Sequence, residues 1–404
     1  MSHADGTTRL MPGRSQALWQ RMIRGWANRI SRGRLTIVFP DGDEFHTSGP
    51  EPGPAATMRL NNARPVWRLI AGGSLGFSQA YLDGDWESPD VAALLELAIV
   101  NEDRLSEILS PSVLSRWFAR FRHVLRANTR AGSRRNIAFH YDLGNDFYAL
   151  WLDPTMTYSS ALFSSENQTL EEAQVAKYRR IIDALEISPT DHVLEIGCGW
   201  GGFAEQAIRQ TGCRVTGLTL SREQAEFSRR RLALAGLGGN ADIRLEDYRD
   251  VQGRFSKIVS IEMFEAVGEE NWPVYFRRIR DLLADGGKAM VQVITIDEAR
   301  FDRYRRNADF IQTFIFPGGM LPSVTAFERC ARQAGLTVED RLRFGGDYER
   351  TLLAWDRAFD THWPRIQPLG FDERFRRMWH YYLHYCAAGF RTGRLDVVQF
   401  TLGR

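Results

Sequence analysis

The sequence is poor in cysteine, and its few thiols are scattered. Four cysteines occur in 404 residues, and no two of them form a C-x-x-C pair. They are Cys198, Cys213, Cys330 and Cys386. This spacing gives no support to a zinc site or a thioredoxin-like redox pair, so no metal is predicted and reduced thiols are expected.

Long hydrophobic runs are also missing. No apolar stretch approaches the roughly 18 residues of a membrane span, and the best candidate, residues 91–100, is interrupted by Glu96. The N-terminus lacks the uninterrupted apolar core of a signal peptide. Hydrophobic residues make up 44% and charged residues 25%, the composition of a globular protein. A cytoplasmic protein of two or three domains is therefore expected.

Acidic residues are absent from residues 14–34, which contain six arginines. Apolar residues recur there at helical spacing: Leu18, Trp19, Met22, Ile23, Trp26 and Ile30. A basic amphipathic segment over residues 1–34 is typical of a helix lying on anionic lipid, which predicts a peripheral protein on the inner membrane face. An ordinary helix packed on its own domain has the same pattern, so both interpretations stay open.

A second basic segment, residues 116–135, holds seven arginines. No RNA- or DNA-binding module surrounds it, so a nucleic-acid partner is not expected. A linker or a phosphate-contacting surface is favoured. Residues 35–130 are interpreted as a small α+β domain, beginning with a strand at 35–39 and a Pro-Asp-Gly-Asp turn, and the family resemblance described below implies that this domain is lipid-associated.

From residue 185 onward, strand and helix patterns alternate, which predicts an open, mostly parallel α/β sheet. Strands are predicted at 191–196, 213–219, 241–246, 256–261, 287–296, 337–344 and 396–402. Helices are predicted at 201–211, 222–236 and 272–284, and a long helical insertion separates the last two strands. The arrangement fits the seven-stranded Rossmann-like sheet of class I methyltransferases, here in a catalytic domain over residues 131–404.

The glycine-rich stretch VLEIGCGWGG, residues 193–202, lies where the first of these strands turns into a helix. Glycines at such a turn let the backbone approach a ligand closely, and the amides of the new helix face it. The spacing is E-x-G-x-G-x-G with an acid before the first glycine. This favours an S-adenosylmethionine loop over a nicotinamide site. The candidate residues are Glu195, Gly197, Cys198, Gly199 and Gly201.

Several motifs together resemble the cyclopropane-fatty-acyl-phospholipid synthase family, which includes the mycolic acid cyclopropane synthases. They are HYDLGNDFY at 140–148, MTYSS at 156–160, LTLSREQ at 218–224, MFEAVG at 263–268, FPGGMLPS at 316–323, DY at 347–348 and YYL at 381–383. The N-terminal third resembles the extra domain of phospholipid-acting members at 73–76 and 81–84. The resemblance implies S-adenosylmethionine as cofactor and unsaturated phospholipid acyl chains as substrate. Oligomeric state is left open, with a homodimer as one alternative.

The resemblance also implies site residues. Tyr158 and Ser159 match contacts to the amino-acid part of the cofactor. Further cofactor contacts are expected at the ends of the second and third strands: Thr219, Ser221, Gln224, Asp247 and Tyr248.

In the family, an alkene attacks the cofactor's methyl group, and a bound bicarbonate ion then removes a proton from the resulting cation. Glu265 and Tyr348 match residues that hold this ion, and Cys386 matches a cysteine discussed as catalytic. Two positions depart from the family: Gln292 stands at the histidine position and Ser160 at the first cysteine position. Glutamine can donate an N–H but cannot carry charge or a proton, so the sequence leaves open whether bicarbonate is bound.

Proton loss from the added methyl group would close a cyclopropane ring. Proton loss from a chain carbon would instead give a methyl-branched olefin, and the sequence does not choose between these products. Two other classes remain: a methyltransferase acting on a small soluble nucleophile, and a lipid-binding protein without catalysis. The basic aromatic N-terminus opposes the first, and the presence of Gly197, Gly199, Glu265 and Tyr348 opposes the second.

Overall fold

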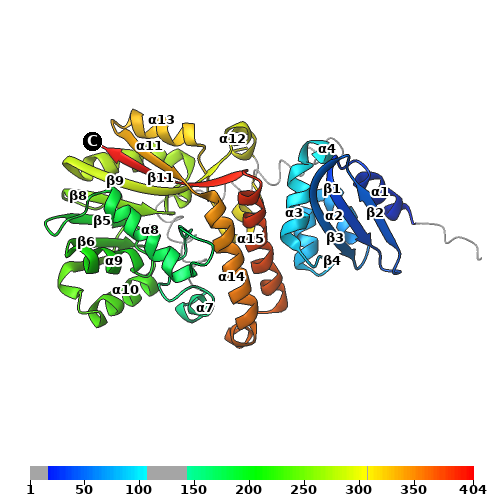
Figure 1. Cartoon of the computed structure of the whole chain (residues 1–404), viewed down its shortest axis with the longest axis horizontal. Helices are drawn as coiled ribbons and strands as arrows, with labels where there is room; N and C mark the ends of the chain where they lie inside the picture. Colours follow the sequence, from blue (N-terminus) through cyan, green and yellow to red (C-terminus); the bar gives the residue numbers. More distant parts are fainter. Residues whose placement is uncertain (1–16, 107–142, 307) are drawn as a thin grey trace, which may run out of the picture.

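A computed structural model describes residues 17–106, 143–306 and 308–404. The basic segment at 116–135, the first residues of the 140–148 motif and the junction predicted at residues 130–131 lie outside this part of the chain. Two bodies are visible in Figure 1, an N-terminal domain in blue and cyan and a larger domain in green to red.

The N-terminal domain is a four-stranded sheet with helices, as the α+β prediction requires. Its strands run in the order β2-β1-β3-β4, with β1 parallel to β3 and antiparallel to β2. The strands are β1 (Arg32–Val38), β2 (Glu44–Ser48), β3 (Glu51–Leu60) and β4 (Trp86–Glu87), and the helices are α1 (Leu18–Ala27), α2 (Arg64–Leu82), α3 (Val91–Val100) and α4 (Glu102–Ser106).

Helix α1 packs on the sheet of this domain. Ile23 and Ala27 are buried in the domain core, and the Trp19 ring lies 5.7 Å from that of Phe39. Its Arg24 forms an ion pair with Asp43 after β1. The packed-helix alternative therefore describes α1, and the expected separate segment ending at residue 34 is corrected, since residue 34 lies within β1. The apolar face of α1 therefore packs in part against its own domain, and Ile23, Trp26 and Ala27 also line the cavity described below.

The larger domain contains the predicted seven-stranded sheet, in the order β10-β11-β9-β8-β5-β6-β7. Strand β11 is antiparallel to both neighbours, and the pairs from β9 to β7 are parallel. The strands are β5 (His192–Ile196), β6 (Arg214–Thr219), β7 (Ala241–Leu245), β8 (Phe255–Ile261), β9 (Leu283–Ile296), β10 (Thr337–Arg343) and β11 (Leu395–Gly403). β9 begins earlier than predicted because Leu283 pairs with Phe255 ahead of a register shift.

Helices connect and cover this sheet (Figure 1). They are α7 (Asn145–Ala149), α8 (Leu170–Ala184), α9 (Gly202–Thr211), α10 (Arg222–Leu234), α11 (Trp272–Leu282), α12 (Glu298–Tyr304) and α13 (Val324–Gln333). The short turns are η1 (Gly238–Asn240), η2 (Phe264–Ala266), η3 (Glu269–Asn271), η5 (Gln367–Leu369) and the π-helical η4 (Ile311–Ile315).

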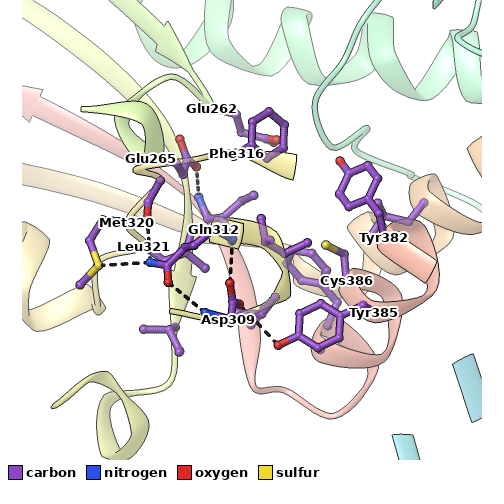
Figure 2. Close-up of a pocket in the computed structure, with 18 of the residues that line it drawn as sticks. Glu262, Glu265, Asp309, Gln312, Phe316, Met320, Leu321, Tyr382, Tyr385 and Cys386 are labelled. Atoms are coloured by element: carbon purple, nitrogen blue, oxygen red, sulfur yellow. Dashed lines mark hydrogen bonds between the residues drawn. The ribbon is translucent and has the colours of Figure 1, made fainter. Parts of the chain in front are cut away.

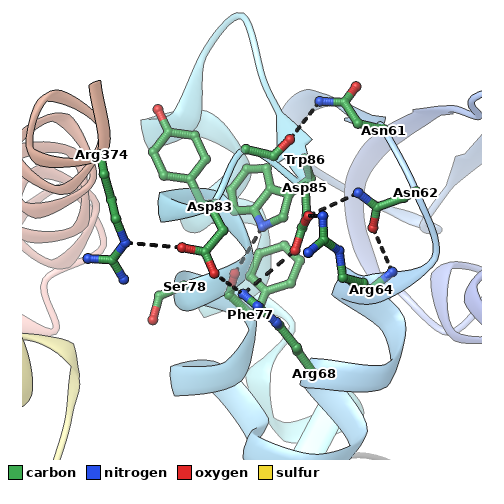
Figure 3. A network of polar contacts seen from close by, with 12 residues as sticks. Asn61, Asn62, Arg64, Arg68, Phe77, Ser78, Asp83, Asp85, Trp86 and Arg374 are labelled. Carbon is green, nitrogen blue, oxygen red and sulfur yellow. Dashed lines mark hydrogen bonds and ion pairs between the residues drawn. The ribbon is translucent and has the colours of Figure 1, made fainter. Parts of the chain in front are cut away.

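The predicted helical insertion is the pair α14 (Gly345–Ile366) and α15 (Glu373–Arg391), which lies between the sheet and the N-terminal domain (Figure 1). Arg374 of α15 donates to Asp83 at the end of α2, as Figure 3 shows, and Arg68 donates to the other oxygen of the same carboxylate. The Tyr81 and Tyr381 rings are 5.4 Å apart across the same boundary. Polar and aromatic contacts thus hold the N-terminal domain against α15.

Within the described part of the chain, every helix is too short or too polar to cross a lipid bilayer.

Candidate active site

A cavity of about 890 Å³ extends from the glycine loop, across the carboxyl ends of the strands, to the N-terminal domain. The catalytic domain lines it from β5, β6, β8 and β9, from η4 and from α15, while α2 and α3 line its far end. Open α/β sheets bind ligands at the carboxyl ends of their strands, which is where this cavity begins. Its walls are mostly apolar, so polar side chains that face it are candidates for specific roles.

The glycine loop has the backbone that its sequence predicts. Gly197 and Gly199 have φ angles of 85° and 52°, a conformation that favours glycine. A Cβ added at Gly199 would meet no atom within 4 Å and would face open space, whereas one at Gly197 would lie 2.9 Å from the Met263 Cγ atom. Gly199 therefore leaves room for a ligand, and Gly197 allows the loop to pack against Met263.

Glu195, at the end of β5, is the charged side chain nearest to this loop in sequence. It is 3% exposed, and its Oε2 atom has no hydrogen-bond partner among the described residues. Burial is the main cause that raises its pKa well above the ordinary value, and the charges of Lys177 and Arg231 oppose the rise. An ammonium group bound here would satisfy the free oxygen and stabilise the carboxylate. The residues present thus fit the amino-acid end of S-adenosylmethionine.

The other predicted cofactor contacts divide into two groups. Those lining the cavity are Tyr158, Ser159, Cys198, Thr219, Gln224, Asp247 and Tyr248. Gly201 and Ser221 do not line it, because Gly201 turns toward Ser228 and Ser221 caps α10 by accepting the Gln224 amide. These two residues have structural roles in the loop and the helix cap, and their direct contact with the cofactor stays a prediction.

Three of the predicted catalytic residues meet around a carboxylate that lines the cavity and that the sequence did not single out. This carboxylate belongs to Glu262, the residue after β8. Its Oε1 atom accepts hydrogen bonds from the Ser160 amide at 2.8 Å and from the Gln292 Nε2 atom at 2.8 Å. Its Oε2 atom accepts one from the Tyr348 hydroxyl at 2.6 Å. Ser160, Gln292 and Tyr348 are thus brought together, and their common partner is Glu262, not the predicted Glu265.

Glu265 lies beside this group on η2 and also lines the cavity (Figure 2). Its Oε1 atom accepts the Ile294 amide at 2.6 Å, while its Oε2 atom has no partner among the described residues. Burial first, and the neighbouring Glu262 charge second, raise the pKa of Glu265 to about 8. Burial also raises the pKa of Glu262, but its three hydrogen bonds and the Lys177 charge oppose that rise, so the negative charge of the pair is favoured on Glu262.

Buried Lys177 of α8 lies behind this group. Its Nζ atom donates to the Ser159 Oγ atom at 2.6 Å and to the Gln174 Oε1 atom at 2.7 Å. Burial lowers its pKa to about 7, and the charge of Glu262 is the largest influence opposing that shift. The same interaction favours the ionised form of Glu262.

Cys386 lines the cavity on α15, next to Tyr382 and Tyr385 (Figure 2). Burial raises the pKa of its thiol far above the ordinary value, so the thiol stays neutral. A buried neutral thiol is a poor nucleophile, so the structure gives Cys386 a place in the cavity wall, and its catalytic role stays a prediction. The Tyr382 hydroxyl is 2.8 Å from that of Tyr158, which joins α15 to the 156–160 segment.

Glu262 and Lys177 are the residues that the sequence-based assignment missed. Glu262 directly follows a parallel strand, which is the position that singled out Asp247, so the same rule could have found it. The MFEAVG motif begins one residue later and drew attention to Glu265. Lys177 carried no signal, because a lysine within a helix is usually exposed.

One trio of metal-ligating residue types occurs in the described part of the chain, away from the cavity: Asp356, His380 and His384. His380 Nδ1 and His384 Nε2 lie 2.5 and 3.0 Å from the oxygens of Asp356. These mutual hydrogen bonds account for the cluster as a link between α14 and α15.

Comparison with known proteins gives consistent matches. The family model described as mycolic acid cyclopropane synthetase matches residues 128–400. The tuberculostearic acid methyltransferase UfaA1 of Mycobacterium tuberculosis is 37% identical over 399 residues, covering 96% of this chain and 92% of that protein. The cyclopropane-fatty-acyl-phospholipid synthase of Escherichia coli is 35% identical over 363 residues, covering 86% and 88%.

Solved structures agree in fold. Mycolic acid cyclopropane synthase CmaA1, in complex with SAH and CTAB, superposes with a TM-score of 0.63 at 34% identity, covering 67% of this chain and 98% of that one. Coclaurine N-methyltransferase, with SAH, gives a TM-score of 0.63 at 18% identity, covering 82% and 99%. The predicted methyltransferase fold is confirmed, and so is the predicted cofactor, S-adenosylmethionine.

Proposed function

Because this chain belongs to the mycolic acid cyclopropane synthetase family and is an S-adenosylmethionine-dependent methyltransferase, we propose that it acts on the cis double bonds of unsaturated acyl chains in membrane phospholipids. When bound, S-adenosylmethionine supplies a methyl group that the alkene π electrons take up, with S-adenosylhomocysteine released and a carbocation left on the chain. The residues of this protein hold the reactants, exclude water and remove the proton.

The observation that carries the proposal is the shape of the cavity. It is continuous from the glycine loop to α2 and α3 of the N-terminal domain, and apolar side chains line most of it. At its far end, α2 departs from helical geometry at Gly73 (φ 58°), and residues 72–75 line the cavity there. A small soluble nucleophile would not require an apolar space that extends into a second domain, whereas a long acyl chain would.

Aromatic side chains line the part of the cavity near Glu262. The Phe316 ring lies 6.5 Å from that of Tyr158 and 6.3 Å from that of Tyr382. Aromatic faces stabilise positive charge in a dry site, and excluding water prevents it from trapping a carbocation. This lining supports chemistry in which a cation develops on an acyl chain.

An exposed apolar pair on α2 supports access to a membrane surface. Trp67 and Ile70, one turn apart, are 48% and 39% exposed, and the next residues of the helix lead to the cavity lining at 72–75. Arg64 precedes the pair on the same helix and is also exposed. These residues, not α1, are the ones we propose to meet an anionic bilayer at the inner face of the cytoplasmic membrane.

Two products remain candidates. The relatives include a protein named as a tuberculostearic acid methyltransferase and one named as a cyclopropane-fatty-acyl-phospholipid synthase. Ring closure would give a cyclopropane, and proton loss from the chain would give a methyl-branched olefin. We favour the cyclopropane as the main product, with the branched chain as its alternative.

Mass spectrometry of phospholipids from cells that express the protein and grow on methyl-labelled methionine tests the proposal. Unsaturated acyl chains should gain one labelled carbon, and cleavage of any remaining double bond distinguishes the two products. Acyl chains without label, in cells that contain folded protein, would contradict a function in lipid modification.

A further inference from the structure

Three hydrogen-bond donors converge at one place in the cavity wall. They are the Ser160 amide, the Gln292 side-chain amide and the Tyr348 hydroxyl, which come from three separate segments of the chain. A group of buried donors of this kind forms a site for one negatively charged, oxygen-rich group. The Glu262 carboxylate fills this site and accepts from all three donors.

The surroundings fix the donors in this arrangement. Gln292 is fully buried in β9 opposite Gln399 of β11, and Gln399 Nε2 donates to Gln292 Oε1 at 3.0 Å. The Gln292 amide oxygen is therefore occupied, and its NH₂ group points to Glu262. The Glu262 backbone amide donates to the Gln292 carbonyl at 2.8 Å, which ties the same two residues together a second time.

The backbone conformation of Glu262 is a second, independent indication that this residue is functional. Its φ angle is 49°, and it is one of three non-glycine residues with positive φ among the described residues, with Met156 and Glu186. Such a conformation is strained for a side chain with a Cβ, and strained residues concentrate at functional sites. Here the strained backbone turns directly after β8, and its side chain enters the cavity.

Resting on the proposed function, we propose that the Glu262 carboxylate is the base that takes the proton from the methylated acyl chain. The Glu262 carboxylate accepts from Ser160, Gln292 and Tyr348, the residues at the positions of the family's bicarbonate site, so turnover does not require that ion. Glu265 is then a neutral neighbour, positioned by the Ile294 amide.

The proton balance is complete without another reactant. The carbocation loses a proton from its added methyl group or from an adjacent chain carbon to a Glu262 oxygen. The electron pair of that C–H bond closes the ring or forms the new double bond. Glu262 is then a neutral acid, and it releases the proton to solvent when the cavity opens for product exchange.

Two substitutions of Glu262 and one control variant test whether its carboxylate is the base. Glu262→Gln keeps the size and the hydrogen-bond acceptor but removes the base. Glu262→Gly removes the side chain, leaves the three donors free and suits a positive φ. Glu186→Gly is the matched control, because Glu186 has a φ angle of 52° but is exposed and far from the cavity.

The first readout is binding, and it needs no turnover. Full-length proteins in carbonate-depleted buffer are titrated with sodium bicarbonate against equal sodium chloride, and thermal unfolding and calorimetry are followed. Bicarbonate should bind and stabilise Glu262→Gly alone, because an added anion satisfies the three free donors. Wild type, Glu262→Gln and Glu186→Gly should show no response. Binding of bicarbonate by wild type, or none by a folded Glu262→Gly, would overturn the assignment of this site to Glu262.

The second readout is methyl transfer from labelled S-adenosylmethionine to vesicles of a dioleoyl phospholipid. Glu262→Gln should lose about 10²- to 10⁴-fold in turnover while its S-adenosylmethionine affinity stays within about twofold. Glu262→Gly should lose as much without bicarbonate and recover at least about tenfold with it. A fully active Glu262→Gln, or a wild type accelerated by bicarbonate, would refute Glu262 as the base. A wild type that methylates no lipid would refute the proposed function, while the binding readout would still decide what occupies the site.

Discussion

The two ends of the catalytic site are built from different parts of the chain. At the cofactor end, the loop after β5 supplies backbone with glycines at fixed spacing, and residues at the ends of β6 and β7 complete the wall. At the reacting end, one side chain from β9, one from α14 and the Ser160 backbone amide converge on Glu262. A change at the cofactor end should therefore affect binding, and a change at the reacting end should affect the chemical step.

The largest expected effect comes from filling the space beside the glycine loop. Gly199→Val should weaken S-adenosylmethionine binding by at least about 100-fold, because its side chain would enter the cavity from a backbone with φ of 52°. Isothermal titration calorimetry measures this. Gly212→Val is the control, since Gly212 has a φ of 73° and open space around it but lies at the end of α9, away from the cavity. Equal losses in both variants would mean that backbone strain, not cavity filling, is responsible.

At the reacting end we expect a smaller effect, and we expect it on kcat and not on the affinity for S-adenosylmethionine. Tyr348→Phe removes one of the three donors to Glu262, and a hydrogen bond to a charged group contributes enough to change kcat by about 10- to 100-fold. The affinity for S-adenosylmethionine should remain that of wild type. A variant that lost cofactor affinity and kept kcat would show that the two ends of the site are not separable in this way.

The difference between the cofactor end and the reacting end also explains which features could be predicted from the sequence. The order of strands, the glycine loop and the buried Glu195 follow from local patterns, since a parallel sheet places successive strand ends at one edge. The role of Gln292 could not be deduced, because its orientation depends on Gln399, which lies 107 residues away in sequence. The sequence also left open whether α1 packs on its own domain or lies on a membrane. An amphipathic helix can cover a sheet or a membrane, and only the fold shows which surface is present.

The far end of the cavity is lined by the N-terminal domain and should affect a third quantity, the binding of the acyl chain. Ile99 of α3 lines the cavity there, and Ile99→Trp should shorten the space for an acyl chain. The KM for phospholipid should rise on the order of 10-fold, with S-adenosylmethionine affinity and kcat little changed. Leu234→Trp, at a residue of α10 that is 85% exposed, is the control. Unchanged kinetics in a folded Ile99→Trp would place the acyl chain elsewhere.

The smallest expected effect is on the pH dependence of the unfolding free energy, which tests whether Glu265 is protonated in the folded protein. Burial and the Glu262 charge raise the pKa of Glu265 from 4.5 to about 8, so folding favours its protonated form. The resulting stability is fully present below pH 4.5 and is lost as pH rises through 8. Glu265→Gln keeps a neutral side chain at every pH and lacks this dependence.

From pH 5 to pH 8, the unfolding free energy of wild type should therefore fall relative to that of Glu265→Gln by on the order of 1 kcal/mol per pH unit. Urea unfolding at fixed pH values measures the difference. Both proteins retain Glu262, Lys177 and Tyr348, so the direct titration of these three groups largely cancels. A difference that does not change with pH would mean that Glu265 is ionised in the folded protein. In that case Glu265 would carry negative charge in the folded protein and could not be the neutral neighbour of Glu262.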